Sequence, residues 1–117
     1  MAQINKPSEH FNTKLYSGTG SSQALTGVGF QPDWTWIKQR TSTQEHWLVD
    51  VVRGTTQFLE SNSTNAESSD GATGFTSFDS DGFTVNTSAR TNASSNTYAS
   101  WNWKAAGTAP TKTYTVK

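Results

Sequence analysis

The chain has 117 residues, five of them tryptophan and none cysteine, and its nine basic residues balance nine acidic ones. A chain of this length forms one domain with a modest core, and the lack of cysteine excludes disulfides, thiol catalysis and cysteine-bound zinc. Because the charges are balanced and scattered, we expect no nucleic-acid partner. No apolar stretch is long enough to predict membrane insertion or a signal peptide.

Apolar and polar residues alternate along most of the chain, and no segment repeats apolar residues at helical spacing for more than a turn. We therefore expect an all-β fold with little or no helix. The first strand is predicted over residues 11–16 and ends in a glycine-containing turn. A weaker strand follows over 23–28, and Pro32 sets a turn before a strand over 34–40.

Residues 46–53 hold the longest apolar run and are predicted to form the buried central strand. Asp50 interrupts this run, and a buried carboxylate needs a partner. We expect that partner to be Arg53, three residues later, in a structural ion pair, or else a nearby backbone amide. A second interpretation is that the face shared by His46 and Asp50 contacts a ligand.

A short strand is predicted over residues 57–60, followed by a polar loop over 61–74 of a length that is often functional or mobile. Residues 75–85 form the clearest hairpin signal, because an Asp-Ser-Asp-Gly sequence lies between two alternating runs. Asp79 and Asp81 offer oxygen ligands at alternate positions, as calcium loops do, but further ligands are missing. No cofactor is therefore expected, and calcium is the weaker alternative.

A second polar loop over residues 86–96 precedes the last strand, which is predicted over 97–104. Residues 1–104 are thus interpreted as the β-domain with an N-terminal arm. Residues 105–111 are small and polar and suggest a linker, while 112–117 alternate again. This last segment is interpreted as a C-terminal strand or as the start of a following β-module in a longer protein.

Four of the five tryptophans come in pairs two residues apart, Trp34 with Trp36 and Trp101 with Trp103, so each pair shares one face of its strand. A domain short of aliphatic residues must build its core from its large side chains. We therefore expect Trp36, Trp101 and Trp103 to be mostly buried.

Trp34 and Trp47 are then the better candidates for exposure. Flat aromatic rings stack on sugar rings, so these two tryptophans, together with His46, form the candidate glycan-binding residues. No catalytic set accompanies them: the two histidines lie far apart in the sequence, and neither a phosphate-binding glycine loop nor a glycosidase carboxylate pattern occurs. An enzyme is not expected.

Four segments, taken in their order and spacing, resemble a domain of bacteriophage tail-fibre and other virion-associated proteins, many from marine phages: residues 27–38, 50–54, 78–85 and 97–104. The resemblance covers nearly the whole predicted β-region. It implies an antiparallel β-sandwich of the concanavalin-like jelly-roll type, similar to laminin-G-like domains, without established enzymatic activity. This chain has Asn102 where the family often has cysteine.

From this resemblance we expect a non-enzymatic virion surface protein that is assembled in the host cytoplasm. It would anchor or space a tail-fibre or head-fibre appendage by binding itself, as a homotrimer, and other virion proteins. The alternative is a module that recognises host surface glycans through the 61–74 and 86–96 loops and an exposed indole. A third, weaker interpretation is calcium-dependent adhesion through Asp79 and Asp81.

Overall fold

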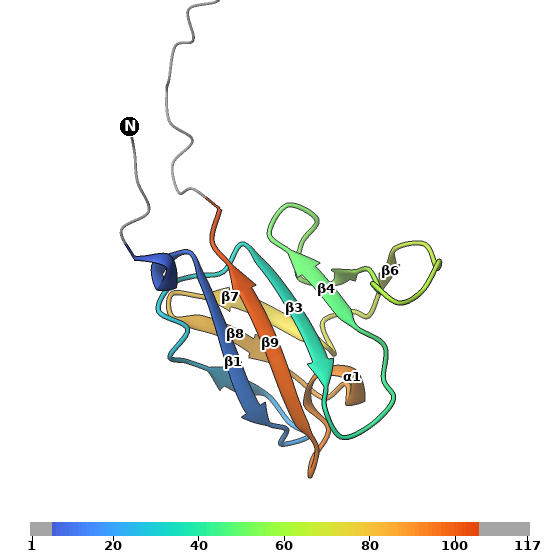
Figure 1. Ribbon diagram of the computed structural model, residues 1–117. Helices are drawn as coiled ribbons and strands as arrows, with labels where there is room; N and C mark the ends of the chain where they lie inside the picture. Colours follow the sequence, from blue (N-terminus) through green and yellow to red (C-terminus); the bar gives the residue numbers. More distant parts are fainter. Residues whose placement is uncertain (1–5, 106–117) are drawn as a thin grey trace, which may run out of the picture.

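Two antiparallel sheets face each other in the computed structural model, which describes residues 6–105 (Figure 1). The four strands of the larger sheet lie in the order β1 (Phe11–Ser17), β9 (Thr97–Trp103), β3 (Trp34–Gln39) and β4 (Trp47–Asp50). The three strands of the smaller sheet lie in the order β2 (Gln23–Leu25), β8 (Gly82–Val85) and β7 (Phe75–Asp79). The predicted all-β antiparallel sandwich is confirmed.

The hydrophobic core lies between these two sheets, and stacked aromatic rings make up much of it. Tyr16 stacks on Tyr98 with ring centres 5.1 Å apart, and Phe75 stacks on Phe83 at 5.2 Å. Burying each such side chain contributes about 1.5–3 kcal/mol. The core as a whole consists of Tyr16, Leu25, Ile37, Trp47, Val49, Phe58, Phe75, Phe83, Val85 and Tyr98.

The prediction of a buried central strand over residues 46–53 was wrong in two respects. The strand β4 ends at Asp50 and is an outer strand of its sheet. The carboxylate of Asp50 accepts hydrogen bonds from the amides of Val52 and Arg53, and this closes a turn directly after the strand. Val52 is consequently 91% exposed, although the sequence places it inside an apolar run.

The hairpin predicted over residues 75–85 is confirmed, since β7 and β8 pair antiparallel around a tight turn. Gly82 begins β8 at a point where the chain passes very close to β2. A Cβ atom at Gly82 would lie 1.8 Å from the carbonyl oxygen of Leu25. Only glycine therefore allows this approach between the hairpin and its neighbouring strand.

Short elements that the sequence pattern did not predict lie in the connecting segments. A 3-10 helix, η1 (Pro7–Glu9), precedes β1, and a short strand β6 (Ser68–Ser69) lies within the loop expected over 61–74. It pairs with β5 (Gln57–Phe58), which confirms the short strand predicted over 57–60. One helical turn, α1 (Ala89–Asn92), lies in the loop expected over 86–96. Among residues 6–105, no helix has the length and apolar character needed to cross a membrane.

Tyrosine hydroxyls fix α1 against one end of the sandwich. The hydroxyl of Tyr98 donates to the carbonyl of Ala89 and accepts from the amide of Ala93, both at 2.7 Å. Ser88 caps the helix by accepting from the amide of Arg90. The predicted linker, apart from Ala105, and the predicted segment 112–117 lie outside the described residues.

Candidate functional site: an aromatic sheet face

The outer face of the four-stranded sheet carries an unusual concentration of aromatic side chains. Because β1, β9 and β3 are paired in register, Phe11 lies opposite Trp103, and Trp103 lies opposite Trp34. Two residues further along the strands, Trp101 lies opposite Trp36. Side chains in cross-strand pairs lie on the same side of a sheet. We call these five residues, Phe11, Trp34, Trp36, Trp101 and Trp103, the aromatic face.

The rings of the aromatic face contact one another across the strands. Trp34 and Trp103 stack with ring centres 4.4 Å apart and an angle of 21° between their planes. Phe11 packs against Trp103 with ring centres 5.0 Å apart. Trp36 and Trp101 are tilted by 59°, with ring centres 5.9 Å apart. Such pairs contribute about 0.5–1.5 kcal/mol each beyond the area that they bury. The face is therefore largely preorganised before any ligand arrives.

A hollow of about 220 Å³ opens on this face, and its lining is formed by Trp36, Trp101 and Trp103. Phe11 is 39% and Trp34 is 36% exposed, and the three tryptophans of the hollow are half-buried. These three side chains are thus mostly covered, as predicted, but the expected position in the core between the sheets was wrong, because they lie on the outer face.

The indoles lie outside because polar side chains occupy the inner positions of the same strands. Thr35 and Asn102 are fully buried, and the Thr35 hydroxyl donates to Oδ1 of Asn102 at 3.0 Å. The amide of Asn102 in turn donates to the carbonyl of Asn12 at 3.2 Å. Because these groups have partners, their burial costs little free energy. The alternation of the strands then sends Trp36 and Trp101 outward.

His46 borders the aromatic face and holds Trp36 in place. The indole N–H of Trp36 donates to Nδ1 of His46 at 2.8 Å. An indole can only donate, so His46 accepts with Nδ1 and is neutral in this contact, with its proton on Nε2. Burial lowers the pKa of His46, and the positive charge of Lys38 lowers it further. His46, a predicted glycan-binding residue, thus lies where it orients one wall of the hollow.

Trp47, the other predicted exposed indole, is a core residue. It is 1% exposed and stacks on Phe58 with ring centres 3.9 Å apart. The guanidinium of Arg90 lies over both rings and is paired with the carboxylate of Glu60 at 2.6 Å. The prediction was wrong because Trp47 and His46 are sequence neighbours and so point to opposite faces of the sheet. Trp34, by contrast, is exposed as predicted.

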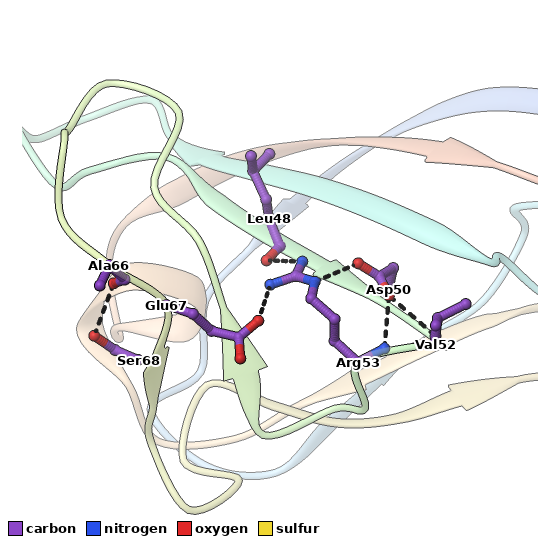
Figure 2. A network of polar contacts seen from close by, with 7 residues as sticks. All are labelled: Leu48, Asp50, Val52, Arg53, Ala66, Glu67 and Ser68. Atoms are coloured by element: carbon purple, nitrogen blue, oxygen red, sulfur yellow. Dashed lines mark hydrogen bonds and ion pairs between the residues drawn. The ribbon is translucent and has the colours of Figure 1, made fainter.

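Asp50 and Arg53, predicted as an ion pair, are brought together in the structure (Figure 2). Nε of Arg53 lies 2.6 Å from Oδ2 of Asp50, and Nη1 reaches Glu67 at 3.1 Å. Partial burial disfavours the ionised carboxylate of Asp50. The hydrogen bonds and charge of Arg53 outweigh this and lower the pKa of Asp50 below its usual value. The network joins the 61–74 loop to β4 and is structural in character.

Asp79 accepts hydrogen bonds from within the hairpin, whereas Asp81 accepts them from the segment after β2. Asp79 accepts from the hydroxyls of Ser77 and Thr84 at 2.8 and 2.6 Å. Asp81 accepts from the amides of Gly27 and Gly29, and these bonds lower its pKa. Within residues 6–105 no three His, Asp or Glu side chains are grouped as a metal site would require.

One of the comparisons with known proteins found a match. A family described as a domain of unknown function, DUF7483, matches residues 6–115. The chain belongs to this family. The match includes every described strand and all five residues of the aromatic face. No curated protein and no solved structure was found to match the chain significantly.

Proposed function

We propose that this domain is a non-enzymatic glycan-binding module on a bacteriophage virion, and that the aromatic face is its binding surface. The observation that carries the proposal is the hollow of about 220 Å³ lined by Trp36, Trp101 and Trp103. The sequence resemblance to virion-associated domains supports the location. A host surface glycan is the ligand that fits both the hollow and this location.

The chemistry of the hollow suits a sugar ring. The axial C–H bonds of a pyranose carry partial positive charge, and the face of an indole carries partial negative charge, so the two attract each other. A tilted pair such as Trp36 and Trp101 can contact one ring from two sides. Thr13 lies in the same cross-strand row and is exposed, so its hydroxyl is available to a sugar hydroxyl. The apolar lining favours an uncharged hexose over an acidic sugar.

Titrating host polysaccharide while following tryptophan fluorescence tests this proposal. Trp101→Thr removes one wall of the hollow and keeps a residue that favours strands. We expect it to weaken binding by about tenfold or more, which corresponds to about 1.4 kcal/mol. The matched control is Val52→Ala, which alters an exposed apolar residue in the turn after β4 and should leave binding unchanged. The absence of binding to any host polysaccharide would overturn the proposal.

A second candidate function is the anchoring role that the resemblance implies. Wide exposed apolar patches on small proteins mark sites of protein contact, and the aromatic face with its exposed Phe11 and Trp34 is such a patch. If Trp101→Thr leaves glycan binding unchanged but prevents incorporation into the particle, the face binds another virion protein.

A further inference from the structure

The outer edge of β1 differs from the other sheet edges in the described residues. On the opposite side of the same sheet, the edge of β4 is covered where Leu48 and Leu59 exchange two backbone hydrogen bonds of 2.9 and 3.1 Å. In the smaller sheet, β2 has only three residues and β7 contains a register shift. β1 has seven residues, no proline and no register shift. Short or irregular strands are how proteins protect their edges.

The backbone of β1 shows which groups face this edge. The carbonyl of His10 accepts from Lys104, and the amide of Gly18 donates to Asn96, both at 2.8 Å. Even-numbered residues of β1 therefore bond to β9, and the backbone groups of odd-numbered residues point away from it. Of these outward amides, that of Thr13 has a local partner, the side chain of Asn12 at 3.0 Å. Among the residues that the structure describes, the other outward backbone groups of β1 have no hydrogen-bond partner.

We propose that a second copy of this chain pairs with this edge, strand β1 against strand β1, antiparallel and related by a two-fold axis at Thr13. Odd-numbered residues must then face odd-numbered residues, so the axis passes through a residue, and the three central positions of β1 are Thr13, Lys14 and Leu15. An axis at Thr13 places Phe11, which is 39% exposed, opposite Leu15 of the second copy, which is 57% exposed. This apolar pair forms twice, once on each side of the axis.

Charge and apolar contact together favour this register over its neighbours. An axis at Lys14 places the two lysines directly opposite each other, which is unfavourable. An axis at Thr13 places Lys14 opposite Asn12 of the second copy. An axis at Leu15 leaves Phe11 beyond the paired segment. Of the three positions, only the axis at Thr13 both separates the two lysines and covers Phe11 together with Leu15.

The geometry limits the assembly to two copies. Pairing consumes the edge of β1, and the edge of β4 is already covered by Leu59. The result is a continuous eight-stranded sheet in which the two aromatic faces lie on the same side. The symmetry is two-fold, in contrast to the trimer expected from the resemblance. The pairing shares Phe11 with the aromatic face, but it does not involve the three tryptophans that line the hollow, so it can form without a glycan.

Mutating Thr13 to charges of opposite sign tests the register. Thr13 is exposed on the outer face, and the axis places it opposite itself. Light scattering after gel filtration should give twice the chain mass for the natural protein at high concentration. Thr13→Lys and Thr13→Glu should each raise the dimer Kd by roughly tenfold or more, because like charges then face each other. Mixing the two variants should restore the dimer.

Thr76→Lys is the matched control, since Thr76 is an exposed strand threonine on the smaller sheet. It should leave the dimer unchanged. A natural protein that stays monomeric at millimolar concentration would overturn the proposal. So would a dimer that persists unchanged in Thr13→Lys, because the copies would then meet on another surface. Trp101→Thr, which lies away from the edge of β1, should keep the dimer while it loses polysaccharide binding, so this variant separates a failure of the dimer from a failure of the glycan proposal.

Discussion

At the scale of single residues, the placement of the tryptophans depends on which neighbours can be buried at low cost. Asn102 and Thr35 satisfy each other inside the sandwich, and this leaves Trp101 and Trp36 outside. The size of an indole alone predicts the opposite. Lys38 is a local signal that predicts the observed placement. It lies two residues after Trp36 and therefore on the same side of β3, and a lysine indicates that this side faces outward. The partner of Asn102 is 67 residues away, so its hydrogen bond has no local signature.

The His46 contact predicts that stability depends on pH. The pKa of His46 in the folded protein lies below its ordinary value of 6.5, mainly because of burial and then because of Lys38. The unfolded chain therefore binds a proton more readily. The stabilising contribution is complete above pH 6.5 and is lost as the pH falls from there through the lower folded pKa.

Urea unfolding at pH 7.5 and pH 5.0 checks this prediction, with His46→Gln as the comparison. Glutamine can still accept from the indole of Trp36 but does not titrate. The natural protein should lose stability relative to His46→Gln on acidification. Parallel pH profiles of the two proteins would show that His46 does not titrate in this way.

At the scale of elements, strands were predicted well because alternation is a local pattern. The segments predicted at 11–16, 23–28, 34–40 and 97–104 correspond to β1, β2, β3 and β9. The order of strands in the sheets is set by distant contacts, so the edge position of β4 was not predicted. The helix α1 has four residues, and its one local signal is the capping Ser88.

The close contact between the hairpin and β2 predicts a large effect of Gly82→Ala. The added methyl group would lie 1.8 Å from the carbonyl oxygen of Leu25, so β2 and β8 must move apart. We expect a loss of about 3 kcal/mol in the free energy of unfolding, measured by urea denaturation. Gly54→Ala is the control, because no atom lies within 4 Å of its Cβ position and only its positive φ is strained. Equal losses in both variants would contradict the contact explanation.

At the scale of the whole molecule, a sandwich without net charge presents one apolar face to its surroundings. With nine basic and nine acidic residues, two copies have no overall charge repulsion to overcome. An edge-paired dimer would place two hollows on one side and allow a repetitive polymer to bind both at once. Two linked sites raise the apparent affinity without any new contact.

The 59° tilt between Trp36 and Trp101 also makes the face optically active. Electronic transitions of two close, non-parallel indoles mix, and this mixing produces paired bands of opposite sign in the ultraviolet circular dichroism spectrum. The couplet should weaken in Trp101→Thr, where only the Trp34–Trp103 pair remains, and survive in Val52→Ala. A ligand that changes the angle between the rings would alter its amplitude, so the domain carries a label-free reporter of occupancy.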